Sequence, residues 1–361
     1  MPLRTGVYFF LRQFRTAGDA GYQHRSIALA EGLRSLGVPV FANINYWRLG
    51  QGSAETLFHD EPSVRPQDCD VVVAEHVYYD AERGFPDAFF SPRRSYRTVF
   101  IDAADGWRTA SMPSYRKGID LVLRCHYNSR FEYGTNVRPW AFGLSERILR
   151  EVEDPTGHER RKKTLLCNHR APHPVRRLAE ERFIPLLNED FVIDREVDDS
   201  PPSDPYDRLM WEQSGRRHHP AYYNRLKTSL ACSAFGGYFV PSFARSLDSP
   251  FLRIAHKAVS VLRFSTRTVA QFDSWRFWES LAAGCVTFHI DLEHYGCRFP
   301  VMPTNGRHYV GIDLARLEAG VSRIRDGTVD LIGLAGKQWA IDHYSPVASA
   351  KRLLQYVQDL K

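Results

Sequence analysis

The chain has 361 residues and a formal net charge of +6. That length allows two domains of ordinary size, each with its own core. No apolar run reaches the roughly 18 residues that span a bilayer, and Arg12 interrupts the apolar start too early for a secretory signal. We therefore expect a cytoplasmic protein without a transmembrane segment. The charge favours anionic partners, such as a nucleotide, a polyanion or an anionic membrane face, without choosing between them.

The six cysteines are scattered, and no two form the CxxC pair that is typical of zinc sites. Most lie in or beside apolar runs, where free thiols fit a reducing compartment. The histidines show no ligand spacing such as HExxH. The sequence therefore predicts no metal site.

The first 150 residues predict strands that alternate with helices. An apolar strand over 6–11 is followed by a loop, a helix over 23–36 that ends at Gly37, and a strand over 38–44. Further strands are predicted at 71–74, 98–102 and 121–124. Strands separated by helices indicate a parallel, doubly wound sheet, so we expect a Rossmann-like N-terminal domain over 1–150.

The first candidate for chemistry is the loop after the first strand, which carries Asp19 between two glycines and leads to His24. A glycine-bearing loop at the carboxyl end of a strand approaches a ligand closely, and a carboxylate or an imidazole there suits a general base. The loop lacks a complete GxGxxG fingerprint. The alternative is structural: Asp19 caps the helix and His24 is an ordinary residue of its first turn.

The second candidate is the pair Asp102 and Asp105, at the end of the strand predicted over 98–102. Two carboxylates at a strand end suit a general base or the binding of hydroxyl groups, and the ring of Trp107 is suited to stacking on a sugar. The DxxD spacing also occurs in metal sites. Simple turn chemistry at Asp105–Gly106 is the remaining alternative.

A polar segment over 151–163, with Pro155 and Gly157, predicts the linker between two domains. A fresh apolar strand over 164–167 then opens a second domain, which we place at 164–344. Its helices and strands alternate as in the first half, which favours a second Rossmann-like unit.

Polar side chains follow the first strand of the second domain. Asn168 and Arg170 lie at its carboxyl end, where parallel sheets bind anionic ligands, and Lys227 on a later helix is a second candidate cation. The segment 197–222 is rich in Pro, Asp and Ser and predicts a long loop. The run over 232–241 predicts a strand whose paired glycines allow close backbone approach.

A helix, a turn and a buried strand then follow in immediate succession. Ser274 is placed to cap a helix that ends at Gly284, and 285–290 predicts the strand. Arg276 and Glu279 lie three apart and share a helix face. A guanidinium neutralises a diphosphate, while a carboxylate accepts hydrogen bonds from both hydroxyls of a ribose. The alternative is an exposed ion pair between the two side chains.

This segment resembles the nucleotide-sugar-binding half of GT-B glycosyltransferases, particularly the bacterial family-1-like and exostosin-like group. Their pattern S-x-R-x-x-E-x-L-A-A-G-C is met from Ser274 to Cys285, and the segments 306–314 and 336–357 resemble the end of the same fold. The resemblance implies an α/β protein with two Rossmann-like domains that face each other across a cleft. It also implies a C-terminal helix over 345–361 that crosses back to the first domain.

The resemblance further implies that Glu279 binds the donor ribose, and that the helix start at Ser274 and Trp275 faces the diphosphate. Many retaining GT-B enzymes have a second glutamate eight positions before the ribose-binding one, but this chain has Gln271 there. The stereochemical outcome therefore stays open. We expect His308, in a loop before a later strand, to border the same pocket. Enzymes of this class generally bind their donors without a coordinated metal.

The sequence thus predicts a metal-independent glycosyltransferase with no cofactor beyond its co-substrate, the nucleotide sugar. It would move the sugar to a hydroxyl acceptor: a glycan in glycan biosynthesis, or a small molecule or modified nucleic acid. Two alternatives stay open, namely a sugar-nucleotide epimerase of the same fold and an inactive relative that binds glycans or nucleic acid.

Overall fold

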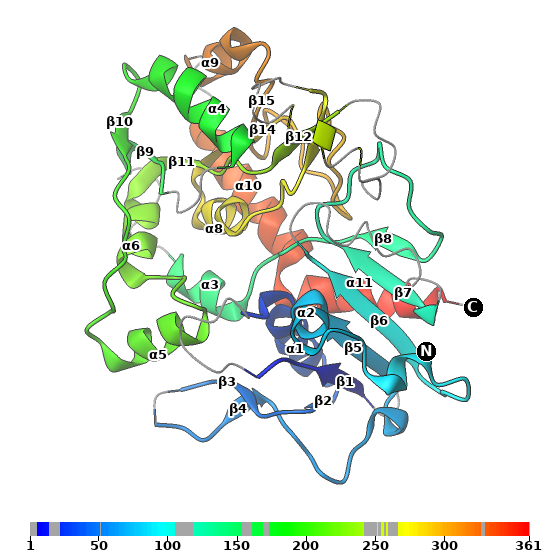
Figure 1. The fold of residues 1–361 in the computed structure, drawn as a ribbon. Coiled ribbons are helices and arrows are strands. Elements are labelled where there is room, and N and C mark those ends of the chain that lie inside the picture. The colour runs from blue at the N-terminus through cyan, green and yellow to red at the C-terminus, as the bar shows by residue number, and fades with distance from the viewer. Residues whose placement is uncertain are drawn as a thin grey trace.

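The structure is a computed structural model. It describes residues 6–13, 22–50, 52–104, 118–153, 161–168, 173–241, 251, 254–255, 258, 266–325 and 329–360. Two α/β units lie one above the other in Figure 1, each built on a parallel sheet. We call the unit with the six-stranded sheet the first domain and the unit with the five-stranded sheet the second domain.

The first sheet has the order β2-β1-β5-β6-β7-β8, and all of its neighbours pair in parallel. Its strands are β1 (Val7–Phe10), β2 (Val40–Ala42), β5 (Val71–Glu75), β6 (Arg97–Asp102), β7 (Leu121–Arg124) and β8 (Val137–Pro139). This confirms the predicted parallel, doubly wound sheet. A short antiparallel pair, β3 (Tyr46–Arg48) and β4 (Thr56–Phe58), lies beside it and was not predicted.

The helices of the first domain are α1 (His24–Ser35), α2 (His76–Glu82) and α3 (Glu146–Glu151), with 3-10 turns at Pro66–Asp68 and Asp87–Phe90. The predicted first helix is confirmed as α1, and Gly37 just after it has the left-handed φ of 73° that favours glycine. Buried Ile27 and Leu33 join α1 to the core of the domain.

The second sheet has the order β10-β9-β11-β14-β15 and is parallel throughout. Its strands are β9 (Lys162–Leu166), β10 (Val192–Asp194), β11 (Ser229–Ser233), β14 (Val286–Ile290) and β15 (Val310–Ile312). The single strand predicted over 232–241 is divided between β11 and the antiparallel pair of β12 (Tyr238–Val240) with β13 (Thr268–Ala270). Gly237 explains the division: its φ is 109°, and a Cβ there would lie 2.6 Å from the carbonyl oxygen of Ala270.

The helices of the second domain are α4 (Pro174–Arg182), α5 (Pro205–Gln213), α6 (Pro220–Thr228), α8 (Trp275–Ala283), α9 (Leu317–Arg325) and α10 (Val329–Tyr344), with a 3-10 turn at Ile184–Leu187. The prediction of a long loop over 197–222 was wrong, because this segment contains α5 and the start of α6. The Asp204 side chain accepts a hydrogen bond from the Asp207 amide, and Pro205 occupies the first helical position. Both are helix-start signals.

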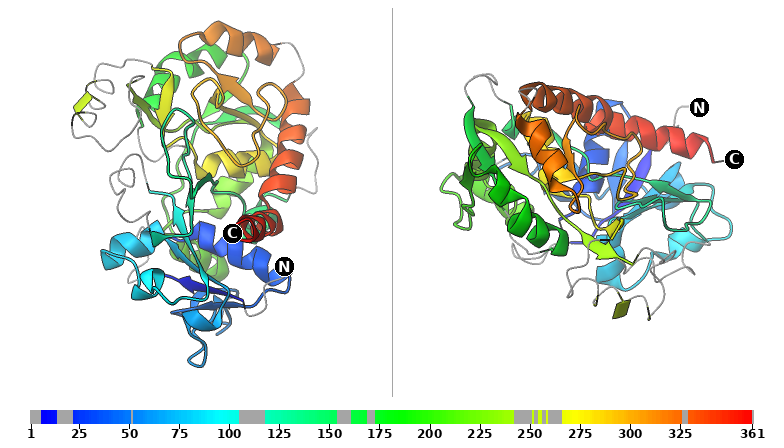
Figure 2. Two further views of the ribbon diagram at one scale, coloured as in Figure 1. Left: turned by 90° about the vertical axis from the view of Figure 1, so that its right-hand side faces the viewer. Right: turned by 90° about the horizontal axis from the view of Figure 1, so that it is seen from above.

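The last helix, α11 (Pro346–Gln358), returns to the first domain, as expected. It lies against α1 in Figures 1 and 2, so closely that a Cβ at Gly32 would collide with the carbonyl of Pro346. Buried side chains from both domains join in one large hydrophobic cluster, and a second, smaller cluster lies within the first domain. Within the described part of the chain, no helix has the length and apolar character needed to cross a membrane.

Candidate functional site

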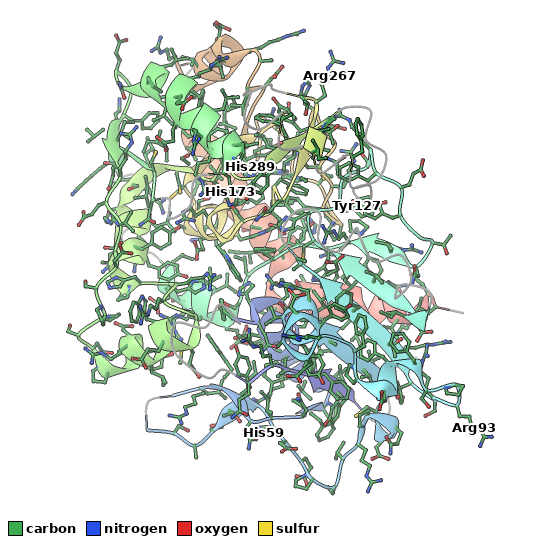
Figure 3. The ribbon with its side chains drawn as sticks, in the orientation of Figure 1. His59, Arg93, Tyr127, His173, Arg267 and His289 are labelled. Atoms are coloured by element: carbon green, nitrogen blue, oxygen red, sulfur yellow. The ribbon has the colours of Figure 1, made fainter. Side chains whose placement is uncertain are left out.

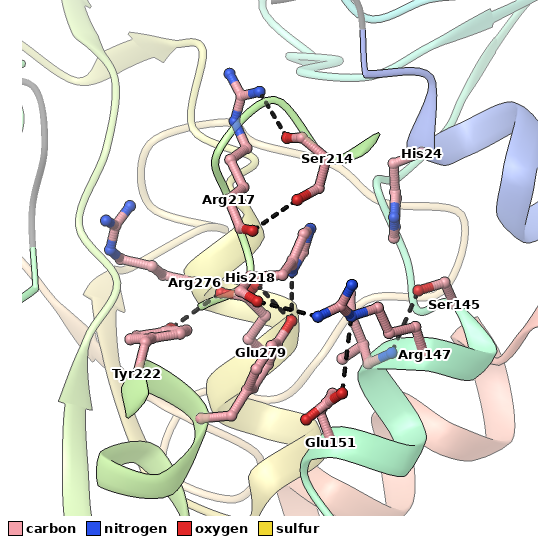
Figure 4. A network of polar contacts seen from close by, with 12 residues as sticks. His24, Ser145, Arg147, Glu151, Ser214, Arg217, His218, Tyr222, Arg276 and Glu279 are labelled. Carbon is pink, nitrogen blue, oxygen red and sulfur yellow. Dashed lines mark hydrogen bonds and ion pairs between the residues drawn. The ribbon is translucent and has the colours of Figure 1, made fainter. Parts of the chain in front are cut away.

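A pocket lies in the second domain at the start of α8, beside the carboxyl end of β9 and the chain that leads into α6 (Figure 4). It combines carboxylate, guanidinium, imidazole, amide and aromatic groups. Its lining residues are Asn168, Asp198, Arg217, His218, His219, Tyr222, Trp275, Arg276 and Glu279. Four of them, Asn168, Trp275, Arg276 and Glu279, are residues that the sequence analysis selected.

Glu279 is 4% exposed. Its Oε2 accepts a hydrogen bond of 2.9 Å from the Tyr222 hydroxyl, and its Oε1 lies 3.3 Å from the Tyr223 hydroxyl and 3.0 Å from His218 Nδ1. Burial alone would raise the pKa of this carboxyl, but the hydrogen bond from His218 and the charge of Arg276 hold it below its usual value. The carboxylate is therefore ionised at neutral pH, and three neighbours occupy three of its roughly four acceptor positions.

Arg276 does not form the surface ion pair that was the alternative interpretation. Its Nη2 donates to Asn168 Oδ1 at 3.2 Å, while Glu279 turns to His218 and the tyrosines. Arg276 Nε is buried and has no hydrogen-bond partner. The two side chains therefore serve the pocket rather than each other.

Ser274 occupies the N-cap position of α8, but its hydroxyl does not cap the helix. It donates instead to the carbonyl of Ala234 at 3.4 Å. The prediction that the Ser274 side chain caps the helix is thus wrong. The positive end of the helix dipole therefore meets the pocket without a capping side chain to offset it.

Cationic groups gather next to the start of α8. Arg176 on α4 is buried and donates to the carbonyl of Phe235 at 3.0 Å. Burial lowers its pKa to about 10, and the charge of Arg276 adds to that shift. His173, labelled in Figure 3, lies at the start of α4, and burial together with Arg176 and Arg276 lowers its pKa to about 4. A buried guanidinium that is repelled by a neighbouring, half-buried one favours an anionic ligand.

The first domain contributes an aromatic wall. The rings of Tyr22 and Trp275 stack with centroids 5.3 Å apart, and His24 meets Trp275 edge-on at 4.5 Å. His24 Nε2 donates to the Gly143 carbonyl at 3.1 Å, which leaves Nδ1 to accept from the Tyr22 hydroxyl at 3.3 Å. Burial places the pKa of His24 well below its usual value. With both nitrogens engaged, His24 positions Trp275 and is a poor proton acceptor.

The carboxyl edge of the first sheet carries two buried ion pairs. Glu75 at the end of β5 binds Arg25 and accepts a hydrogen bond of 2.9 Å from the Ser26 hydroxyl. Asp102 at the end of β6 binds Arg124 at 2.6 Å. Asp102 was predicted as a candidate base, but the structure shows its carboxylate buried and engaged in this ion pair.

Asp273 joins the two domains. Its Oδ2 accepts from the Phe142 amide at 2.8 Å and its Oδ1 from Trp278 Nε1 at 2.6 Å, while its own amide donates to His126 Nδ1 at 3.1 Å. Burial raises the pKa of Asp273 to about 7 against the effect of the first two hydrogen bonds. These bonds fix the entry to α8 relative to the first domain.

Two other predicted residues lie away from the pocket. His308 precedes β15, at the amino end of that strand, and its ring stacks on Trp339 with centroids 5.8 Å apart. The expectation that His308 borders the pocket is wrong, because parallel strands present their amino ends at the opposite edge of the sheet. Lys227 is in the last turn of α6 and does not line the pocket.

Gln271 is buried just before α8 and has a left-handed φ of 54°, which is uncommon for a residue other than glycine. Asp19, Asp105, Trp107 and Arg170 lie outside the residues that the structure describes.

Sequence reasoning missed the partners of Glu279, which are His218, Tyr222 and Tyr223. All three lie in or next to the segment that was predicted to be a loop. The pair His219–Pro220 was an available signal, since a polar N-cap followed by proline starts a helix, and here His219 caps α6. Arg176 was also missed, although it lies on the helix that follows the first strand of the second domain.

No protein-family model matches the chain, and no curated protein matches its sequence. Solved structures match it over nearly its whole length. The crystal structure of AviGT4, a glycosyltransferase involved in Avilamycin A biosynthesis, matches with a TM-score of 0.53 and 14% identity, covering 99% of this chain and 98% of that one. An α-glucosyltransferase in complex with UDP-glucose and DNA containing an abasic site has a TM-score of 0.52 and 9% identity, covering 99% and 100%.

A glycosyltransferase from Rickettsia africae ESF-5 also has a TM-score of 0.52, with 10% identity and coverage of 99% and 98%. At such low identity these likenesses concern the fold. The chain has the GT-B glycosyltransferase fold, with two Rossmann-like domains, as the sequence resemblance implied.

Proposed function

We propose that this protein is a glycosyltransferase that moves a sugar from a nucleotide-sugar donor to a hydroxyl acceptor. The observation that carries the proposal is the pocket at the start of α8, where Glu279 is ionised and buried beside Arg276. A carboxylate beside a guanidinium and an uncapped helix start suits a ligand that carries both a ribose and a diphosphate.

In this proposal Glu279 accepts a hydrogen bond from the ribose of the donor. Because three neighbours already occupy most of its acceptor positions, binding both ribose hydroxyls displaces one tyrosine hydroxyl from the carboxylate. Tyr222, which lines the pocket, is the one placed to move. Asn168 holds Arg276 in position through their hydrogen bond.

The diphosphate lies at the start of α8, between Ser274 and Trp275 on one side and the guanidiniums of Arg276 and Arg176 on the other. These groups stabilise the charge that develops on the departing diphosphate, so the proposed reaction needs no coordinated metal. UDP is the first nucleotide to test, because one of the similar structures holds UDP-glucose.

The acceptor approaches from the carboxyl edge of the first sheet, opposite the donor. If the reaction inverts, the base that takes its proton comes from the first domain in this proposal, and the predicted residues Asp19 and Asp105 are the candidates. Asp102 and His24 are bound to Arg124 and Gly143, which suits them to holding the site in shape. The remainder of the rate enhancement comes from positioning donor and acceptor together.

The test is the exchange Glu279→Gln, which keeps the shape of the side chain and removes its charge. We expect donor affinity to fall about 10- to 100-fold, since hydrogen bonds to charged groups contribute about 1.5–3 kcal/mol. Thermal shift and titration calorimetry with UDP, GDP, CMP and dTDP and their sugars measure the affinity. Glu293→Gln is the matched control, because the Glu293 side chain is 83% exposed.

Unchanged donor affinity in Glu279→Gln would contradict the assignment of the pocket. Nuclear magnetic resonance of the donor alone separates the alternatives. Isomerisation of the sugar without an acceptor indicates an epimerase. Binding of polyanions that weakens steeply with salt, without any nucleotide binding, indicates a binding protein.

A further inference from the structure

Asp198 lines the pocket but has no part in the proposed function. It lies on the segment that follows β10, and its side chain is 11% exposed. Asp194, Glu196 and Asp198 alternate along the chain, and every second side chain of an extended segment points the same way. All three reach Arg225 of α6, whose Nη1 lies 2.9 Å from Asp194 Oδ1 and 3.6 Å from Glu196 Oε2, and whose Nη2 binds Asp198 Oδ2. Arg225 therefore fixes Asp198 at the wall of the pocket.

Helix α6 places Asp198 close to Glu279. Tyr222 and Arg225 lie three residues apart on α6, so their side chains are neighbours, with Cβ atoms about 5–6 Å apart. Tyr222 donates to Glu279 Oε2 at 2.9 Å, while Arg225 binds Asp198. The two carboxylates are therefore held at neighbouring positions of one helix. With the ribose at Glu279 and the diphosphate at the start of α8, the base is the part of the nucleotide that remains for Asp198.

One oxygen of Asp198 is left for a ligand. Arg225 occupies Oδ2, and no described residue donates a hydrogen bond to Oδ1. Three carboxylates around one guanidinium also leave an excess of negative charge on this side of the pocket. Arg217 lines the pocket too, but its guanidinium turns to the Ser214 carbonyl at 3.3 Å, away from Glu279 (Figure 4). This side of the pocket therefore favours a group that donates hydrogen bonds over a phosphate.

A second polar group of the pocket also lacks a partner. His218 is buried, its Nδ1 lies 3.0 Å from Glu279 Oε1, and its Nε2 has no hydrogen-bond partner among the described residues. A buried polar atom without a partner costs free energy, so such an atom in a native structure calls for an explanation. A polar ligand in this pocket is one.

Nucleobases differ in what they offer to a carboxylate. Uracil, thymine and guanine carry a hydrogen atom on the ring nitrogen of their base-pairing edge, whereas cytosine and adenine have a lone pair there. An ionised carboxylate accepts hydrogen bonds and donates none, so it binds the first group and repels the lone pair of the second. A site that hydrogen-bonds one group of a ligand rejects analogues without that group, because its own buried polar atom is then left unpaired.

We propose that Asp198 selects the nucleobase of the donor by accepting a hydrogen bond from a ring N–H, and so admits uracil, thymine or guanine and excludes cytosine and adenine. This inference rests on the proposed function, because it takes the ribose to lie at Glu279. Asp198 determines which nucleotide binds and has no role in the transfer of the sugar.

Two pairs of nucleotides separate the effect of the ring nitrogen from the size of the base. UDP and CDP differ at this edge among the pyrimidines, and GDP and ADP differ there among the purines. Titration calorimetry with these nucleotides measures the selectivity of the wild-type protein, Asp198→Asn and Glu196→Gln. In Asp198→Asn the amide oxygen still accepts from Arg225, which turns the amide N–H towards the pocket. Glu196→Gln is the control, because its exchange also removes a carboxylate from Arg225, but the Glu196 side chain is 74% exposed and does not line the pocket.

We expect the wild-type protein to bind UDP more tightly than CDP, or GDP more tightly than ADP, by about tenfold or more, the effect of one hydrogen bond to a charged group. Asp198→Asn should abolish or reverse this preference, because its N–H donates to the lone pair of cytosine or adenine. Glu196→Gln should keep the preference. Asp198→Ala, which removes the acceptor altogether, should also abolish it and takes the place of Asp198→Asn if that variant does not fold.

Equal binding of the two members of each pair by the wild-type protein overturns the inference, as does an unchanged preference in the Asp198 variants. If nucleotide binding depends on Glu279 but shows no preference within either pair, the proposed function stands and only this inference fails. If the wild-type protein binds none of these nucleotides, the proposed function itself fails, and this inference with it.

Discussion

Buried carboxylates are held in two different ways in the two domains. At the edge of the first sheet, Glu75 and Asp102 are each neutralised by an arginine. In the pocket of the second domain, Glu279 is held by hydroxyl groups and an imidazole. A neutral donor gives up its hydrogen bond more readily than a paired guanidinium, since no charge is left unpaired when it moves. The first arrangement suits structure and the second suits exchange with a ligand.

The largest effect should come from breaking the ion pair of Glu75. Glu75→Gln leaves the Arg25 charge in a place where neither side chain is more than 4% exposed, and breaking such a pair costs about 3–5 kcal/mol of unfolding free energy. Urea denaturation followed by circular dichroism measures it. Glu55→Gln is the control, because Glu55 is 60% exposed and lies 3.9 Å from Arg34. Equal stability of the two variants would show that the buried pair contributes nothing.

Glu31 sharpens the comparison, because it is a buried carboxylate that is neither paired with an arginine nor held by hydroxyl groups and an imidazole in the described part of the chain. Its Oε2 accepts one hydrogen bond of 2.8 Å from the Glu146 amide, and burial raises its pKa from 4.5 to about 8 in spite of that bond. At pH values between about 4.5 and 8, the folded protein therefore binds more protons than the unfolded chain. Stability should therefore fall as pH rises through this window, by at most about 1.4 kcal/mol per pH unit.

Urea unfolding at a series of pH values between 5 and 8 tests this expectation, with Glu31→Gln as the comparison. The exchange should flatten the pH dependence of the unfolding free energy, because the amide does not titrate. Asp273, whose pKa burial raises to about 7, contributes in the same direction and remains in the variant. Identical slopes in the two proteins would mean that Glu31 is ionised when folded.

The smallest effects should come from Lys227→Ala and His308→Ala. Neither residue lines the pocket, so nucleotide and nucleotide-sugar affinity should match the wild-type values. Any change in stability should be small for Lys227→Ala, within about 0.5 kcal/mol, as is usual for surface positions. A marked loss of donor affinity in Lys227→Ala would mean that the donor extends along α6 beyond the pocket.

Many of the strands and helices were predictable from the local pattern of apolar and polar residues. Short apolar runs bounded by polar residues gave the main strands of both sheets, because a strand buried on both faces is apolar along its length. The segment from Ser274 to Ile290 was correctly predicted as helix, left-handed turn and strand, since Gly284 has a φ of 78° and ends α8, and β14 follows. These features depend on residues close together in the chain.

The chemistry around that segment was decided by tertiary structure. The sequence determined that Glu279 lies on a helix next to Arg276, but not that His218 and Tyr222 would hold its carboxylate, because these residues come from more than 50 positions away. Whether a carboxylate is paired by an arginine, held by hydroxyl groups or left nearly alone depends on which elements pack together. Local pattern fixes most of the strands and helices. Burial and long-range neighbours fix the charge of each carboxylate, the tautomer of each histidine and the partners that each side chain contacts.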